Sequence, residues 1–472
     1  MSSVSLTGIS MALLGLLALF AGEVTAADLP EHVNNPFAGA DMYVNPDYAR
    51  EVSLSIRDAG SKALAEKMRS IQGLPTAIWL DRIESIAGGP KNNNLLGLRE
   101  HLLAALEQRR EGVPLVVVLV LYNLPNRDCA ALSSHGTLDY RAGGLDRYKH
   151  EFIDVIAGIL GDPRFASLRV VIVLEPDSLP NMVTNLWHPV CRMVNRHRVY
   201  EQGIRYAIER LAELANVYLY LDIAHAGWLG WDESMRKAAR YYAQVLRGIG
   251  PWAINRIDGF ATNVAGFVPV EEVWLPDPDM QVGGKPVRAA GFYAWNPRFD
   301  ERDYIESLYP VLVSAGFPSS IRFIVDSSRN GWGGPERPSA APRKTLDVDA
   351  YVDRARLDRR FHRGNWCNPT GAGLGPRPRT EPFGPGHPIA AFFWIKPPGE
   401  SDGTSDARQT QPDAEGKRYD PMCDPAYIVR HGPHPSLKPT GAMANAPAAG
   451  HWFREQFEML VEHAYPPVRR SQ

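Results

Sequence analysis

Residues 114–123 (PLVVVLVLYN) and 169–177 (RVVIVLEPD) are apolar runs that end in polar residues. Such near-continuous runs are typical of parallel strands buried on both faces of a sheet. Five further stretches share this design: 75–81, 217–225, 259–266, 322–329 and 390–400. Between them the pattern indicates amphipathic helices at 47–71, 94–111, 145–160, 198–214, 233–248 and 302–315. The alternation predicts an α/β fold, a distorted parallel (β/α) barrel of about seven strands that is TIM-barrel-like, in preference to an open sheet.

Polar side chains stand where the predicted strands end. In a parallel barrel these ends share one face, and active sites are built there. The face is expected to carry Asp81, Tyr122, Glu175, Asp177, Asp222, His225, Asn263, Asp326, Arg329, Lys396 and Glu400. Any one of them could cap a helix or pair with a neighbour, and we interpret His225 as a structural histidine. Together they would cost free energy unless they served a polar ligand.

Charge and composition exclude some classes of protein. The 472 residues hold 51 Lys+Arg against 53 Asp+Glu, without the basic excess that is usual in nucleic-acid binders. Hydrophobic residues make up 44% and charged residues 22%, as in ordinary globular proteins. We therefore expect no nucleic-acid partner.

The first residues predict export. Residues 9–22 (ISMALLGLLALFAG) are too short to span a bilayer comfortably, and Val24-Thr25-Ala26 resembles a signal-peptidase site. Residues 1–10 lack Lys and Arg, so a membrane anchor or a buried helix is the alternative. We predict a signal peptide at 1–26 and a single catalytic domain at 27–472. The mature protein would be secreted, monomeric and free of the membrane.

Four cysteines fit an exported protein: Cys129, Cys191, Cys367 and Cys423. None forms a CxxC motif, so we expect no zinc, and neither a metal nor a cofactor is predicted. Of the three possible pairings, the sequence-local one joins 129 to 191 and 367 to 423. Each disulfide would close a loop of about 60 residues and would stabilise the folded state by roughly 4 kcal/mol on the chain-entropy model. Free buried thiols are the alternative.

Three functions fit the predicted polar face. Glycoside hydrolysis needs a carboxylic acid and usually a second carboxylate, and sugar rings stack on indoles. The chain supplies both kinds of group, namely Asp128, Glu175, Asp177, Asp222 and Asp402 with Trp79, Trp228, Trp231, Trp366 and Trp394. A Schiff-base enzyme would use Lys396, but nearby carboxylates favour its charged ammonium form. A non-catalytic carbohydrate-binding protein would need the tryptophans without the clustered carboxylates.

Several long motifs carry a family resemblance: YNLPNRDCAA from Tyr122, LEPDSL from Leu174, YLDIAHAGWLGW from Tyr220, ATNV from Ala261, WCN from Trp366 and WIKPPGESDG from Trp394. They resemble glycoside hydrolase family 6, and in particular its bacterial secreted cellobiohydrolases. The resemblance runs from about Asn35 to about Phe457. It implies a cellulase that acts on cellulose and cello-oligosaccharides with inversion, on a distorted barrel of fewer than eight strands.

The resemblance also implies roles for single residues. Asp177 matches the general acid, and Asp128 matches the carboxylate that keeps the acid protonated and stabilises positive charge. Asp402 matches the proposed base, a role that a relayed water could take instead. Tyr122 matches a residue that distorts the sugar, and Ser134 one that contacts the attacking water. The implied substrate-binding residues are Trp79, Asp81, Asp222, Trp228, Trp231, Asn263, Arg329, Trp366, Lys396 and Glu400.

Loop lengths bear on the mode of attack. The chain keeps a full segment from Cys129 to Lys149, 20 residues between Asp402 and Cys423, and the long stretch 267–300. Within the family such loops imply a roofed tunnel that releases cellobiose from non-reducing ends. An endoglucanase with an open cleft is the alternative.

Overall fold

The computed structural model describes residues 32–343, 345–429 and 438–468. The predicted signal peptide at 1–26 lies outside these residues. Within the described ranges, no helix is both long and apolar enough to cross a membrane.

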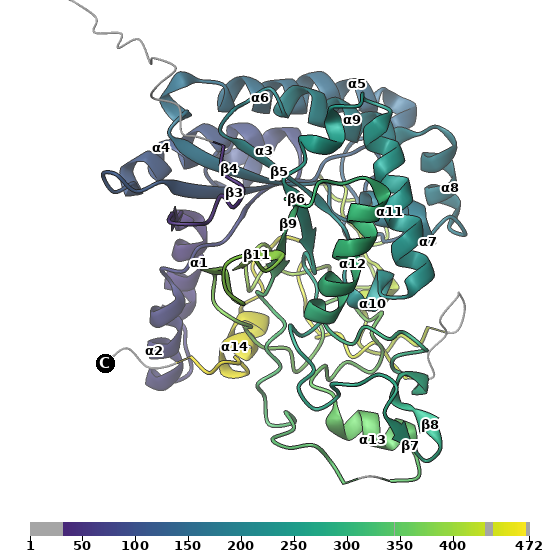
Figure 1. Ribbon diagram of the computed structural model, residues 1–472. Coiled ribbons are helices and arrows are strands. Elements are labelled where there is room, and N and C mark those ends of the chain that lie inside the picture. Colours follow the sequence, from purple (N-terminus) through teal and green to yellow (C-terminus); the bar gives the residue numbers. More distant parts are fainter. Residues whose placement is uncertain (1–31, 344, 430–437, 469–472) are drawn as a thin grey trace, which may run out of the picture.

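Seven parallel strands form the centre of the molecule (Figure 1), and each coincides with a predicted run, although β4 and β11 begin one residue before theirs. Their spatial order follows the chain: β2 (Ile78–Leu80), β3 (Leu115–Leu121), β4 (Leu168–Leu174), β5 (Val217–Asp222), β6 (Gly259–Thr262), β9 (Arg322–Asp326) and β11 (Ile389–Phe393). The short β1 (Asp41–Met42) pairs with β3 in parallel, and β10 (Arg379–Thr380) pairs with β11 in the antiparallel sense.

The sheet curls until its two edges meet. Thr76, just before β2, forms a parallel bridge with Trp394, just after β11, and the amide of Ala77 donates to the carbonyl of Trp394 at 3.1 Å. Alternate residues of β3 face different cores: Val118 and Val120 pack inside the curl, whereas Val117 and Leu119 pack under the helices. This alternation explains why the strands are apolar throughout, and it confirms the distorted barrel.

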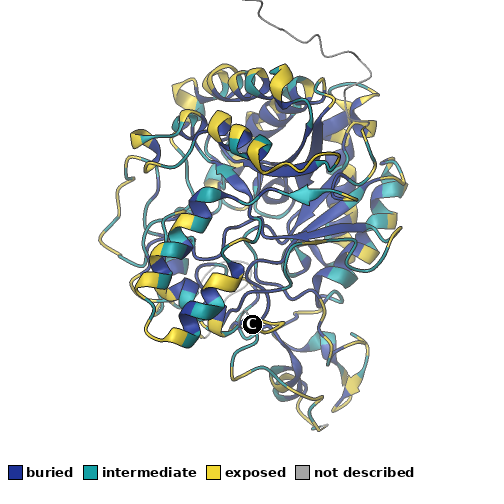
Figure 2. Cartoon of the chain, turned by 90° about the vertical axis from the view of Figure 1, so that its left-hand side faces the viewer, coloured by how far each residue is buried: buried dark blue, intermediate teal, exposed yellow. Residues whose placement is uncertain are grey.

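Helices cover the outside of the barrel and expose their outer faces (Figure 2). Five of the six predicted helical stretches are found: α4 (Leu98–Gln108), α5 to α6 (Gly144–Leu160, with the π-helix η4, Tyr148–Ile153, between them), α9 (Val199–Leu211), α11 (Asp232–Arg247) and α12 (Glu301–Ala315). The prediction of one helix over 47–71 is wrong, because the chain breaks into α1 (Pro46–Arg57) and α2 (Lys62–Ile71). Ser61 caps α2 by accepting a hydrogen bond from the amide of Leu64 at 3.1 Å.

The sequence reading missed several shorter elements: α3 (Ile83–Ala87), α7 (Ser178–Thr184), α8 (Pro189–Arg196), α10 (Ala226–Leu229), α13 (Val348–Ala355) and α14 (Arg454–Glu462). Helix α7 contains Pro180 and Asn181, which have low helix propensity, so local preference did not reveal it. The helix nevertheless begins directly after Asp177, its N-cap residue, and so positions the predicted acid.

A lobe projects below the barrel in Figure 1 and holds α13 and the hairpin of β7 (Gln281–Val282) and β8 (Lys285–Pro286). Its small core is separate from the barrel cores and includes Tyr293, Phe299 and Val352. The stretch 267–300, predicted as a long loop, forms much of this lobe.

Two disulfides confirm the sequence-local pairing. Cys129 joins Cys191, and Cys367 joins Cys423. The first ties the residue after Asp128 to helix α8, and the second ties the residue after Trp366 to the end of the 403–423 segment. Both bonds therefore brace loops that reach the carboxyl ends of the strands.

Candidate active site

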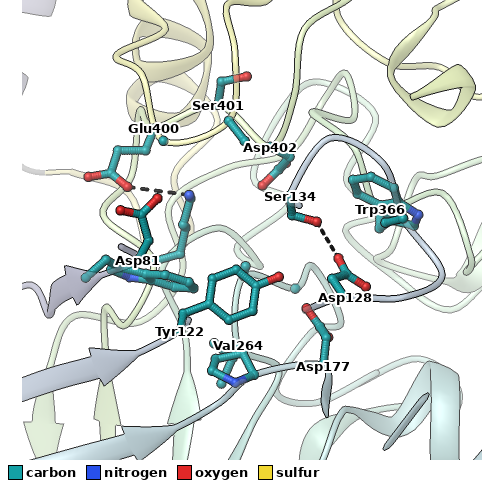
Figure 3. A pocket seen from close by; sticks show the side chains of 18 of the residues that line it. Asp81, Tyr122, Asp128, Ser134, Asp177, Val264, Trp366, Glu400, Ser401 and Asp402 are labelled. Carbon is teal, nitrogen blue, oxygen red and sulfur yellow. Dashed lines mark hydrogen bonds and ion pairs between the residues drawn. The ribbon is translucent and has the colours of Figure 1, made fainter. Parts of the chain in front are cut away.

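A cavity of about 850 Å³ lies at the carboxyl ends of the strands. Among its lining residues are twelve of the fifteen predicted catalytic and substrate-binding residues: Trp79, Asp81, Tyr122, Asp128, Ser134, Asp177, Trp228, Trp231, Trp366, Lys396, Glu400 and Asp402. In Figure 3, the side chains of Tyr122, Asp128, Ser134, Asp177 and Asp402 gather around one space. Residues spread over 324 positions of the chain thus meet because strand order follows chain order around the barrel.

Asp177 is one of the carboxyl groups around this space. It follows β4 with a left-handed backbone (φ 59°), and its amide donates to Asp222 Oδ2 at 3.0 Å. Burial, reinforced by the charges of Asp128 and Asp222, raises the pKa of Asp177 well above its ordinary value. The raised pKa favours the protonated form of Asp177, which suits the residue to act as a general acid.

Asp128 faces Asp177 from the loop after β3, also with a left-handed backbone (φ 45°). The hydroxyl of Ser134 donates a hydrogen bond to Asp128 Oδ2, and Asn181 Nδ2 lies 3.4 Å from Asp128 Oδ1. Burial raises the pKa of Asp128, while these two hydrogen bonds oppose that rise. Asn181 also donates to the carbonyl of Asp177, so it links the two acidic residues. Sequence reading missed Asn181, although its position one helical turn after Asp177 was a usable signal.

Tyr122 is held against the space by two neighbours. The guanidinium of Arg127 lies 4.3 Å from the centre of the Tyr122 ring, and Trp79 meets the same ring edge-on at 5.6 Å. Arg127 Nε also donates to the carbonyl of Ser134 at 2.8 Å. One buried arginine thus positions both the tyrosine and the serine loop, and sequence reading did not single it out.

Asp402 lies in the segment after β11, and an ion pair with Arg329 holds its side chain in place. Arg329 Nη2 lies 2.9 Å from Oδ1 and Nη1 lies 3.0 Å from Oδ2, and the amide of Asn368 donates to Oδ2 at 2.9 Å. Arg329 is fully buried, so it pairs with Asp402 from behind.

Three of the predicted substrate-binding residues lie behind the cavity wall. Besides Arg329, these are Asp222 and Asn263. Asp222 accepts from the amide of Asp177, and burial raises its pKa to about 7. Asn263 Nδ2 donates to the carbonyl of Asp326 at 2.9 Å, and its Oδ1 accepts from the amide of Val268. None of the three lines the cavity, and each has polar partners within the protein.

One end of the cavity, next to Trp79, is rich in charge. Trp79 Nε1 donates to the carbonyl of Ile395 at 2.8 Å, and Lys396 Nζ lies 5.1 Å from the Trp79 ring centre and 3.4 Å from Glu400. Lys417 Nζ reaches Asp81 at 3.1 Å. The ammonium of Lys417 and the guanidinium groups of Arg127 and Arg82 outweigh burial and lower the pKa of Asp81. Lys417 and its partner Glu415 line the cavity but were not predicted, because the 403–423 segment carries no regular pattern.

The opposite end is aromatic. Trp366, Trp228 and Trp231 line it. Trp228 Nε1 donates to Thr184 Oγ1 at 2.7 Å, and Trp231 Nε1 donates to the carbonyl of Ala294 at 3.1 Å. Trp187, another lining residue, was not predicted.

Two cavity-lining segments touch one another. The amide of Leu132 donates to Asp420 Oδ2 at 2.7 Å, and Ser133 Oγ donates to the carbonyl of Asp402 at 2.9 Å. At Gly416 (φ +83°) a Cβ would lie 2.5 Å from the carbonyl oxygen of Gly136, so the two backbones are in close contact. The loop after β3 and the 403–423 segment thus close the cavity along this side.

The described residues contain no group of three or more His, Cys, Asp or Glu side chains arranged to hold a metal ion.

Known proteins share this architecture. Residues 37–464 match the model of "Glycosyl hydrolases family 6". Exoglucanase A of Cellulomonas fimi is 48% identical over 447 residues, which cover 94% of this chain and 50% of that protein. The chain thus spans about half the length of this relative.

Solved structures of similar proteins share the fold of this chain. The catalytic domain of Cellulomonas fimi Cel6B superposes with a TM-score of 0.88 at 47% identity, covering 94% of this chain and 98% of that one. Cellobiohydrolase II (Cel6A) of Humicola insolens, in complex with glucose and cellotetraose, gives a TM-score of 0.69 at 32% identity and covers 92% and 100% of the two chains. The chain belongs to glycosyl hydrolase family 6.

Proposed function

We propose that this protein is a secreted cellulase that hydrolyses β-1,4-glucosidic bonds with inversion and releases cellobiose from non-reducing chain ends. The observation that carries the proposal is the pair Asp177 and Asp128 at the centre of a cavity whose ends hold tryptophans. A similar protein, cellobiohydrolase II, is named in complex with cellotetraose, which supports cello-oligosaccharides as ligands. The active form would be a monomer.

Asp177 supplies the proton in this mechanism. Its carboxyl group transfers the proton to the glycosidic oxygen as the bond from that oxygen to C1 breaks. The raised pKa of Asp177 favours the protonated form that this step needs. Asp128 contributes twice, because its charge opposes ionisation of Asp177 and would stabilise the positive charge that develops on the sugar ring.

A water molecule attacks C1 from the opposite face and gives up a proton. Asp402 is the candidate acceptor, but three donor groups already lie against its oxygens: Arg329 Nη1 and the amide of Asn368 donate hydrogen bonds to Oδ2, and Arg329 Nη2 lies 2.9 Å from Oδ1. A carboxylate has roughly four lone-pair sites, so about one would remain for the water. Ser134 stands beside Asp128 and could pass the proton along a short chain of waters. The geometry favours this relay through water, and the charge of Asp402 would orient the water molecules.

Contact between the two loops favours release of cellobiose from chain ends. A roofed cavity admits a chain by its end, whereas internal cleavage needs an open cleft. The hydrogen bonds from Leu132 to Asp420 and from Ser133 to Asp402 join the loops that would form this roof. The charged group around Asp81, Lys417 and Glu415 fixes the same segment at the Trp79 end.

The deciding measurement is the product profile from amorphous cellulose, with soluble and insoluble reducing ends counted over time. We expect nearly all new ends to be soluble, as cellobiose, and the first product to carry the α-anomeric configuration by proton NMR. A large insoluble fraction would indicate an endoglucanase. Absence of any sugar release would favour a carbohydrate-binding protein. An Asp177→Ala variant with unchanged turnover would contradict the acid assignment.

A further inference from the structure

Trp295 lies just beyond the aromatic end of the cavity, and 59% of its surface is exposed. The three residues before it, Phe292, Tyr293 and Ala294, line the cavity. The carbonyl of Ala294 accepts the hydrogen bond from Trp231 Nε1 at 3.1 Å. The backbone beside Trp295 is therefore in direct contact with a tryptophan that lines the cavity.

The lobe holds this indole in a fixed place. The amide of Trp295 donates to the carbonyl of Arg288 at 2.7 Å, and the Arg288 guanidinium lies 5.9 Å from the Trp295 ring centre. Arg288 Nε is itself paired with Asp279 at 2.8 Å. On the inner side, Tyr293 stacks on Phe299 with ring centres 3.7 Å apart. A backbone hydrogen bond thus anchors Trp295 and a guanidinium lies over its ring, and both contacts restrict the movement of the side chain.

The backbone here is costly to form. Ala294 and Trp295 both have left-handed conformations, with φ of 48° and 66°. Each such residue other than glycine costs roughly 1–2 kcal/mol. An exposed tryptophan recovers little of that cost by burial, so folding alone does not explain why a large aromatic residue stands at this position.

We propose that Trp295 is a stacking platform for a glucose unit of the cellulose chain that still lies outside the cavity. The inference rests on the proposed function. If the non-reducing end lies at the Trp79 end of the cavity, the rest of the chain leaves past Trp366, Trp228 and Trp231. An uncharged glucan presents apolar C–H faces, for which a rigid indole is suited and no charged partner is needed. Trp295 acts before cleavage, by binding polymer at the mouth.

The test compares a long and a short substrate. Cellotetraose extends only two glucose units past the cleaved bond when it yields cellobiose, so we expect it to end inside the cavity, short of Trp295. For Trp295→Ala we expect the initial rate on insoluble cellulose, and the fraction of protein bound to it, to fall about two- to tenfold, as loss of one aromatic contact implies. The rate on cellotetraose is expected to stay unchanged, and Trp295→Phe is expected to recover most of the loss.

The chain offers a matched control in Trp252. It is 44% exposed and precedes β6, so it lies at the amino ends of the strands, away from the cavity. Trp252→Ala is expected to match the unmodified chain on both substrates. Equal behaviour of the two alanine variants on cellulose would overturn the proposal, and so would an equal fall of Trp295→Ala on both substrates, which would mean that the residue only supports Trp231. If the unmodified chain does not cleave cellotetraose, the proposed function fails, and cellulose binding alone still tests Trp295.

Discussion

Arg329 forms a two-point ion pair with Asp402, in which Nη1 donates a hydrogen bond to Oδ2 at 3.0 Å and Nη2 lies 2.9 Å from Oδ1. Both side chains lie behind or at the wall of the cavity. Such a bidentate pair has little freedom to reorient. The pairing makes Asp402 a fixed negative charge beside the reacting sugar, and it separates the role of Asp402 from that of the proton donor Asp177.

The first prediction concerns the base. In Asp402→Ala, we expect a loss smaller than the roughly 10²–10⁴-fold that a general base contributes, because a water relay continues to remove the proton. Added azide is expected to give no rescue, measured as the initial rate on cellotetraose. Strong rescue, with formation of a glycosyl azide, would identify Asp402 as the direct base. Because the substitution leaves the Arg329 charge buried, Asp402→Asn serves as the companion variant that keeps the shape of the side chain.

The second prediction concerns the pH profile. After burial, the charge of Asp128 is the main reason why the pKa of Asp177 is raised. Removing that charge in Asp128→Asn lets Asp177 lose its proton at lower pH, so the alkaline limb of kcat/KM is expected to move to lower pH, with a lower maximum. Asp146→Asn, which removes an exposed carboxylate, is the control and should leave the limb in place. A limb that stays or moves upward for Asp128→Asn would contradict the assignment.

The third prediction concerns stability. Because the pKa of Asp177 is higher in the folded chain than in the unfolded chain, the folded state binds the proton more tightly. Stability therefore falls as pH rises from about 4 towards the raised pKa, by about 1.4 kcal/mol per pH unit. Asp177→Asn removes this penalty. We expect it to be nearly inactive yet more resistant to guanidinium than the unmodified chain at pH 8, with a smaller difference at pH 5. Parallel stability curves would show that Asp177 carries no such penalty.

The fourth prediction concerns the roof. Asp420→Ala removes the acceptor of the Leu132 amide, a hydrogen bond to a charged group that is worth about 1.5–3 kcal/mol. That change would raise the population of an opened roof about ten- to hundredfold from its starting value. We expect a larger share of insoluble reducing ends from amorphous cellulose, with the rate on cellotetraose little changed.

The control for the roof lies in the same segment. Asp406 is partly exposed and pairs with Arg408, two residues away, at 2.8 Å. Asp406→Ala is therefore expected to keep the product profile of the unmodified chain. If Asp420→Ala gives the same profile as this control, the contact between the loops does not decide the mode of attack.

Much of the fold could be predicted from the sequence because its signals are local. Seven apolar runs became seven strands, since a strand buried on both faces must be apolar at every position. The motifs around Asp128, Asp177, Asp402 and the tryptophans likewise placed twelve of fifteen site residues on the cavity. The disulfides followed from sequence proximity and were confirmed.

Only the tertiary structure decided what each polar residue touches. Asp222, Asn263 and Arg329 match the family pattern, yet they contact other protein groups behind the cavity wall. Arg127, Asn181 and Lys417 stand in irregular or unfavoured local sequence, so no periodic pattern identified them. The contact between Leu132 and Asp420 joins residues 288 positions apart. Chain composition determines which segments are buried, whereas hydrogen-bond partners depend on side-chain directions that are fixed only when the barrel closes and the loops pack across it.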